Sequence, residues 1–225
     1  MKRSQVNQAI RWAEELLARN NIHLPDTAAY APEKWAQIKD QAQTVFKTMM
    51  GWDITDFGSG NFDEIGCVLY TVRNGLITDD SVGVPYCEKY LLFKEGQRLP
   101  KHYHLYKSED IINRAGGVLE VMLWNTDEEG KQLETDVEIY MDGIKRTFKA
   151  GEKIHILPGN SISLTPHIAH IFGPKPGTGE LVAGEVSKVN DDNTDNYFME
   201  PVGRFPTIQE DEPAYRLLCN EYPKG

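Results

Sequence analysis

The chain has 225 residues, of which 40% are hydrophobic and 26% are charged, a composition typical of a soluble globular protein of one domain. Its net charge of −10 is not offset by any basic run, so we expect no nucleic-acid partner. No apolar stretch approaches the roughly 20 residues that span a bilayer, so we also expect no membrane role.

The location follows from the N-terminus and the cysteines. The first residues lack the apolar region of a signal peptide. Cys67, Cys87 and Cys219 are widely spaced and odd in number, which indicates buried, reduced thiols. We therefore predict a cytoplasmic protein.

Residues 1–50 have the apolar spacing of helices. The first helix is predicted to begin with Ser4 as its N-cap and to end at Asn20-Asn21. A second helix is predicted to begin near Pro32, with one apolar stripe from Trp35 to Met49. We expect residues 1–50 to form a helical extension that packs on the rest of the protein or on a partner subunit.

After residue 50, short β-rich runs alternate with turn residues. Asn74-Gly75 and Asp142-Gly143 are hairpin-turn signals. This texture predicts a mainly β fold, an antiparallel sandwich or barrel over residues 51–225 within a single domain, with the C-terminal segment wrapped around it. The predicted strands are 66–73, 86–94, 118–125, 136–140, 144–148, 153–157, 161–164, 169–172 and 181–189.

Two imidazoles and a carboxylate follow one another closely at His102, His104 and Glu109. Alternate residues of a strand share a face, so both histidines can point inward, and Glu109 can return on the next strand. A third imidazole can come from His170 or from His167, and we favour His170 because it leads the next apolar run. Three imidazoles and one carboxylate suit Mn, Fe, Co, Ni or Zn, and four protein ligands leave two octahedral positions for substrate oxygens.

The same segment resembles a known motif. Gly96, His102, His104, Glu109 and Gly116 stand at every spacing of the first cupin motif, G-x5-H-x-H-x4-E-x6-G. The second cupin motif is matched more loosely around residues 158–170. The resemblance implies a cupin-type antiparallel β-barrel, of the double-stranded β-helix or jelly-roll kind, preceded here by α-helices.

Longer strings narrow the resemblance. Residues 51–58, 70–75, 109–114, 185–192 and 204–206 resemble the D-lyxose isomerase family of cupin sugar isomerases. This implies a Mn²⁺-dependent aldose–ketose isomerase that interconverts D-lyxose with D-xylulose, and D-mannose with D-fructose. It also implies a homodimer, and His102, His104, Glu109 and His170 as the metal ligands.

Isomerisation requires groups that move protons. Glu185, in an apolar strand, is the predicted base if it points inward, and Lys107 is the predicted acid unless it is a solvated turn lysine. Lys89 alternates with apolar residues and is predicted to contact substrate. Asp192, in an acidic turn, and Arg204, which can pair instead with the acidic residues 210–212, are further predicted sugar contacts.

Two other functions fit a metal-binding cupin. One is an Fe(II) oxygenase, although four protein ligands differ from the open triad of two histidines and one carboxylate. The other is a non-catalytic cupin that binds a metal or a sugar, because one fold hosts many functions. Neither agrees with the longer strings as well as the isomerase does.

Overall fold

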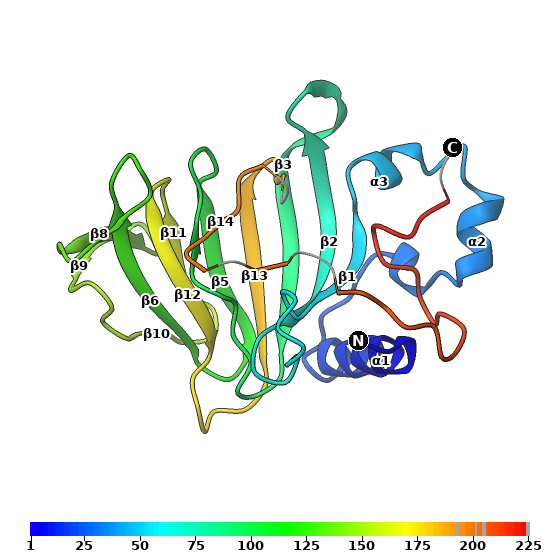
Figure 1. Ribbon diagram of the computed structural model, residues 1–225, viewed down its shortest axis with the longest axis horizontal. Coiled ribbons are helices and arrows are strands. Elements are labelled where there is room, and N and C mark those ends of the chain that lie inside the picture. The colour runs from blue at the N-terminus through cyan, green and yellow to red at the C-terminus, as the bar shows by residue number, and fades with distance from the viewer. Residues whose placement is uncertain (192–193, 201, 204–205, 224–225) are drawn as a thin grey trace.

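A computed structural model describes residues 1–225 except 192–193, 201, 204–205 and 224–225. The helices gather at one end of an elongated molecule, beside β1 and β2, and both termini lie at that end (Figure 1). They are α1 (Arg3–Arg19), the 3-10 helix η1 (Asp26–Ala29), α2 (Pro32–Gln37) and α3 (Gln43–Lys47). None of the helices among the described residues has the length and apolar character needed to span a membrane.

Two antiparallel sheets make up the rest of the protein (Figure 1). The first has the order β1-β2-β3-β13-β5-β11-β8-β9, and the second has the order β10-β6-β12-β4-β14, with β7 paired to β6. The strands are β1 (Gly51–Thr55), β2 (Cys67–Leu76), β3 (Asp79–Phe93), β4 (His102–Tyr103), β5 (Glu109–Gly116), β6 (Leu119–Thr126), β7 (Gln132–Leu133), β8 (Val137–Met141), β9 (Ile144–Phe148), β10 (Ile154–Ile156), β11 (Ser161–Leu164), β12 (Ile168–Pro174), β13 (Leu181–Lys188) and β14 (Tyr197–Phe198). The predicted mainly β fold with N-terminal helices is confirmed.

Two of the apolar clusters among the described residues position the site, one between the sheets and one beneath α1. Leu91, Leu123 and Phe172 belong to the first, which joins strands of both sheets. Val6 and Ile10 of α1 pack with Trp52 and other residues of the first sheet in the second. Helix α1 therefore packs on β1, β2, β3 and β13, and residues of the same sheet on its opposite face line a cavity.

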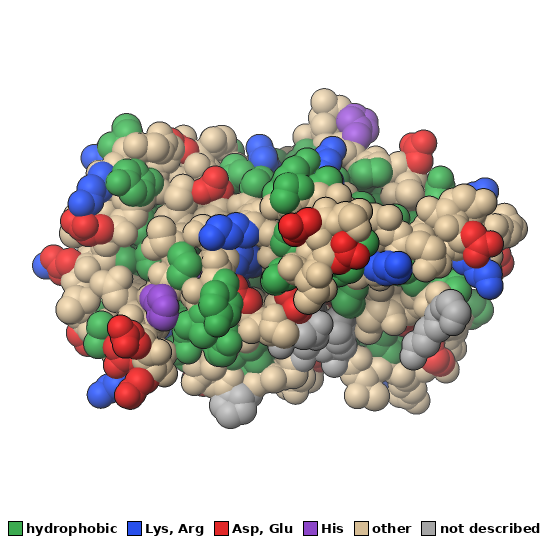
Figure 2. Space-filling view, turned by 90° about the horizontal axis from the view of Figure 1, so that it is seen from above, with side chains coloured by type: hydrophobic (Ala, Val, Ile, Leu, Met, Phe, Trp, Pro, Cys, Tyr) green, Lys and Arg blue, Asp and Glu red, His purple; other side chains and the backbone are tan. Residues whose placement is uncertain are grey.

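Charged side chains of both signs are interspersed on the surface seen from above (Figure 2). The three cysteines, Cys67, Cys87 and Cys219, are all buried. Their predicted burial is thus confirmed.

The prediction of one helix from Pro32 onward is wrong. The segment forms α2 and α3, separated by a turn, and both helices pack on Tyr222 from the C-terminal segment. The rings of Trp35 and Phe46 each lie 4.7 Å from the Tyr222 ring, measured between centroids. At 1.5 Å per residue, one straight helix would separate residues 35 and 46 by roughly 16 Å, so both could not contact the same ring.

Ser4 is not the N-cap of α1, because the helix begins at Arg3, two residues earlier than predicted. Lys2 occupies that position, and Gln5 Oε1 accepts a hydrogen bond from its backbone N–H at 2.8 Å. Ser4 instead donates its N–H and its hydroxyl to the carboxylate of Asp211. A tertiary contact with the C-terminal segment thus replaces the local cap.

Of the two hairpin turns, one is confirmed and one is wrong. Asp142-Gly143 joins β8 to β9 with positive φ at both residues, as a type I′ turn requires. Asn74 and Gly75 lie inside β2, and the chain turns only at residues 77–78. The Asn74 side chain is buried and hydrogen-bonded to distant segments, and these contacts override the local turn preference.

Candidate metal and active site

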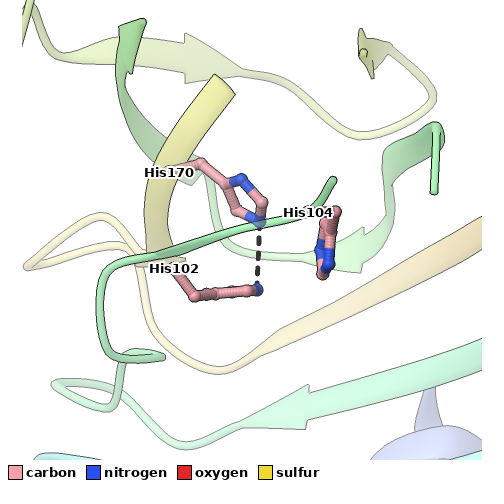
Figure 3. A group of neighbouring side chains, drawn as sticks. All are labelled: His102, His104 and His170. Carbon is pink, nitrogen blue, oxygen red and sulfur yellow. Dashed lines mark hydrogen bonds between the residues drawn. The ribbon is translucent and has the colours of Figure 1, made fainter. Parts of the chain in front are cut away.

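The three histidines meet where the second sheet faces the first. His102 of β4 is paired directly with His170 of β12, and His104 follows β4 immediately. Their ring nitrogens converge (Figure 3), and ligand atoms of all three lie within 4.8 Å of one another. The group contains His170 and not His167, whose backbone N–H donates to the carbonyl oxygen of His104.

Each of these rings is held in one tautomer. A carbonyl oxygen only accepts hydrogen bonds, so an Nδ1 that contacts one must carry the proton. The Nδ1 atoms contact backbone carbonyl oxygens at 2.8 Å for His102 and Pro100, 2.5 Å for His104 and Asp195, and 3.0 Å for His170 and Ile168. Each neutral ring therefore presents an Nε2 lone pair, the arrangement typical of a metal ligand.

The Nε2 lone pairs of the three rings face one another, and in this tautomer none of these nitrogens carries a proton. His102 Nε2 lies 3.1 Å from His170 Nε2 (Figure 3), and burial, followed by the neighbouring His170 and His104, holds the pKa of His102 well below its ordinary value. His104 Nε2 and Glu109 Oε1 are buried and lack a hydrogen-bond donor among the described residues. A divalent cation would satisfy these atoms, so the donor set fits a metal.

Glu109 begins β5 and reaches the same point from the first sheet. Its Oε1 lies 3.1 Å from His170 Nε2 and 3.5 Å from His104 Nε2. Burial raises the pKa of this carboxyl, but the charge of Lys107, followed by the contacts with His104 and His170, outweighs burial and holds the pKa well below its ordinary value. Glu109 is thus a carboxylate placed among three imidazoles.

A buried charge cluster adjoins the histidines. Lys107 Nζ lies 3.0 Å from each of three oxygens, namely Glu109 Oε2, Glu185 Oε1 and Asn190 Oδ1. Lys89, directly opposite Glu185 in the pairing of β3 with β13, places its Nζ 3.7 Å from Glu185 Oε1. Glu185 therefore points inward, and Lys107 is buried rather than solvated.

A cavity opens onto both groups of residues. It holds about 470 Å³ that no protein atom fills, including its open mouth. Charged and imidazole side chains line one part, and Leu91, Phe172 and Phe198 are among those that line the rest. The polar residues that line it are Lys89, His102, Lys107, Glu109 and Glu185, together with Thr55 and Asn196.

The structure thus brings together six of the predicted site residues, which are His102, His104, Glu109, His170, Lys107 and Glu185, and sets Lys89 beside them. Asp192 and Arg204 lie outside the described residues. No position is therefore assigned to these two predicted sugar contacts.

Asp195 is a site residue that the sequence did not reveal. Its carboxylate accepts hydrogen bonds from the backbone N–H groups of Leu105, Tyr106 and Lys107, and its carbonyl oxygen accepts from His104. Asp192 was the residue of the acidic turn at 191–196 that we predicted as a sugar contact, whereas Asp195 was not predicted and is buried. Nothing in the turn's composition distinguishes an aspartate that binds its own turn from one that binds a remote loop.

Comparison with known sequences identifies the family of this chain. The sequence model described as D-lyxose isomerase matches residues 1–222. The chain belongs to the D-lyxose isomerase family. It is 44% identical over 223 residues to the D-lyxose/D-mannose isomerase of Serratia proteamaculans, and 40% identical over 227 residues to that of Escherichia coli O157:H7. Both matches cover 99% of this chain and 98% of the relative.

Solved structures of sugar isomerases share the fold of this D-lyxose isomerase family member. The L-ribose isomerase of Acinetobacter sp. DL28, in complex with L-ribose, aligns with a TM-score of 0.62 at 15% identity. The ligand-free L-ribose isomerase of Cellulomonas parahominis aligns with a TM-score of 0.56, also at 15% identity. Both alignments cover 93% of this chain and 98% of the other, and they support the predicted cupin-type barrel.

Proposed function

We propose that this protein is a metal-dependent aldose–ketose isomerase that interconverts D-lyxose with D-xylulose, and D-mannose with D-fructose. Family membership and the 40% and 44% identical relatives, named for D-lyxose and D-mannose, support the reaction class and the substrates. The observation that carries the proposal is the contact of Lys107 with both Glu109 and Glu185 beside three converging histidines. This places candidate metal ligands and proton-transfer groups on one cavity.

His102, His104, Glu109 and His170 are the proposed metal ligands. Their unpartnered buried atoms support this assignment, and Mn²⁺ is proposed from the resemblance of the motifs, although the donor set also suits Fe, Co, Ni and Zn. When bound, the metal supplies a Lewis acid that stabilises negative charge on sugar oxygens. The three histidine rings are already oriented without a bound metal, because each Nδ1 is hydrogen-bonded to a backbone carbonyl oxygen.

Glu185 and Lys107 are the proposed proton-transfer groups. An aldose becomes a ketose when a proton leaves C2 and one is added at C1, with a matching transfer between the two oxygens. Glu185, a carboxylate that lines the cavity, would take the carbon-bound proton, and the Lys107 ammonium would donate to an oxygen. Lys89, opposite Glu185, would hold that carboxylate and meet a sugar hydroxyl.

The finer assignments extend this proposal. We propose that Asp192 and Arg204 contact the sugar, that residues 1–50 form an extension to a cupin barrel over 51–225, and that the protein is a cytoplasmic homodimer. Size-exclusion chromatography with light scattering tests the dimer, for which a monomeric mass would be contradictory. Alanine variants at residues 192 and 204 should raise the KM for sugar more than they lower kcat.

The decisive assay measures sugar products and oxygen in parallel. The Mn²⁺-loaded protein is incubated with D-lyxose, D-mannose and L-ribose, in air and without oxygen. Ketose formation at equal rates in both atmospheres supports the isomerase, whereas oxygen consumption indicates an oxygenase, and neither product nor consumption indicates a binding protein. In D2O, the proton-transfer route should add deuterium at C1 of the ketose, and its complete absence would favour a hydride shift.

A further inference from the structure

Asn74 makes contacts that a hairpin-turn residue does not make. Its side-chain Nδ2 donates to the carbonyl oxygens of Thr48, at 3.1 Å, and Asn190, at 3.0 Å. Its Oδ1 accepts from the backbone N–H of Asn190 at 3.0 Å. Asn74 therefore holds both backbone polar groups of Asn190, a residue 116 positions away, and ties it to the helical end of the protein.

Asn190 carries that connection into the charge cluster. Its Oδ1 lies 3.0 Å from Lys107 Nζ, the same distance that separates this nitrogen from Glu185 Oε1 and Glu109 Oε2. The Asn190 oxygen is the neutral member of the three acceptors. It can therefore orient the ammonium without adding to the negative charge between the carboxylates.

The hydrogen-bonded pair of Asn74 and Asn190 lies between two cavities. Asn74 and Asn190 line a second cavity with Thr48, Asp53 and Thr71, while Lys107 lines the cavity of the proposed active site. A shorter side chain at position 74 would enlarge the second cavity and leave the backbone groups of Asn190 to water. The Asn190 side chain would then shift relative to the Lys107 ammonium.

We propose that Asn74 is a positioning residue for the isomerase reaction: by fixing the backbone of Asn190, it holds the Lys107 ammonium between Glu109 and Glu185. Neither asparagine lines the cavity of the proposed active site, so both act through the lysine. The proposal rests on the proposed isomerase function and adds a residue that neither motif nor metal site requires. A misplacement of about 1 Å at a reacting group can cost on the order of 100-fold in rate.

The test compares Asn74→Ala and Asn190→Ala with the parent protein in the conversion of D-lyxose. Each variant should lower kcat by about 10- to 100-fold, with little change in KM or in bound metal, because sugar and metal contacts remain. The double variant should be no slower than the slower single variant, since both break one connection. Asn74→Ala should cause no further loss in a Lys107→Met background.

Asn7→Ala is the matched control. Asn7, in α1, is another buried asparagine that binds a distant segment. Its side-chain oxygen accepts from the N–H of Tyr215, and its side-chain nitrogen donates to the carbonyl oxygen of Pro213 and to Glu212. Its loss should lower thermal stability and leave kcat unchanged. A purely structural role for Asn74 would give the same result as this control.

The outcomes separate the inference from the proposed function. A parent protein that converts no sugar would refute the function itself. An active parent with parental kcat in Asn74→Ala, or with additive losses in the double variant, would overturn the inference alone. If Asn74→Ala does not fold, Asn190→Ala decides, because it keeps the backbone bonds to Asn74 and removes only the oxygen that contacts Lys107; parental kcat there would overturn the proposal.

Discussion

Replacing Glu185 with glutamine tests the assignment of the proton-transfer base. Glutamine keeps the volume of the side chain and an oxygen that can accept from Lys107 and Ser187, which lie 3.0 and 3.2 Å from Glu185 Oε1. It removes the basicity that proton abstraction requires. Since general acid–base catalysis contributes roughly 10²- to 10⁴-fold, we expect kcat for D-lyxose to fall within that range.

The cost in stability follows from the charges in the cluster. Two ammonium groups, Lys89 and Lys107, contact the Glu185 carboxylate, so the substitution removes one negative charge from beside them. A hydrogen bond to a charged group contributes about 1.5–3 kcal/mol, and glutamine keeps part of it, so the loss should not exceed about 3 kcal/mol. For a chain of this size, that upper limit corresponds to a fall in Tm of roughly 6–12 °C.

The assay is the initial rate of ketose formation at saturating D-lyxose, with metal content and Tm measured on the same sample. Metal content should match the parent, because Glu185 is not among the proposed ligands. Glu138→Gln is the control, since Glu138 is an exposed carboxylate that also contacts one lysine, Lys145. A Glu185→Gln kcat within about threefold of the parent, at equal metal content, would refute the role of Glu185 as base.

Three further predictions concern the metal and the stability of the fold. His102→Ala and Glu109→Gln should each lower bound Mn²⁺, measured by mass spectrometry of the metal, and activity in proportion; full metal content in either would contradict its role as a ligand. Mn²⁺ at 100 times its Kd should raise the free energy of unfolding by about 2.7 kcal/mol and Tm by roughly 5–11 °C, and His170→Ala should abolish that shift. Burial raises the pKa of Tyr222, which donates to the carbonyl oxygen of Met50, so the unfolded chain ionises above about pH 10 while the folded protein keeps its proton. The free energy of unfolding therefore keeps its full value below pH 10 and falls as the pH rises further. Tyr222→Phe should reduce that fall by up to about 1.4 kcal/mol per pH unit, measured by urea unfolding between pH 10 and 11.5. Parallel pH profiles of the variant and the parent would refute this reasoning.

Local sequence patterns predicted the structure correctly where contacts between neighbouring residues determine it. Asp142-Gly143 forms its turn with positive φ at both positions, a conformation that Asp and Gly adopt readily. The spacing from His102 to Glu109 brings two imidazoles and a carboxylate together because a strand end and the start of the next strand meet at one point. The apolar strand around Glu185 left its direction open, and the structure shows it buried beside Lys107.

Contacts between distant segments explain what the sequence did not reveal. Asn74-Gly75 has the composition of a turn, but the hydrogen bonds of Asn74 to Thr48 and Asn190 keep it inside β2. Asp195 binds the loop that carries Lys107, a pairing across 88 positions that no spacing rule predicts. The predicted strands also omitted β1 and the two-residue strands β7 and β14, which are short segments held by pairing with other strands.

The central claim is that three histidines and Glu109 hold a metal with which the protein isomerises D-lyxose. The most direct test is the rate of D-xylulose formation by metal-stripped protein, without oxygen, before and after Mn²⁺ is added. We predict no ketose before addition and restored formation afterwards, in proportion to the metal bound. Full activity in protein free of metal, or no ketose from fully loaded protein, would contradict the claim.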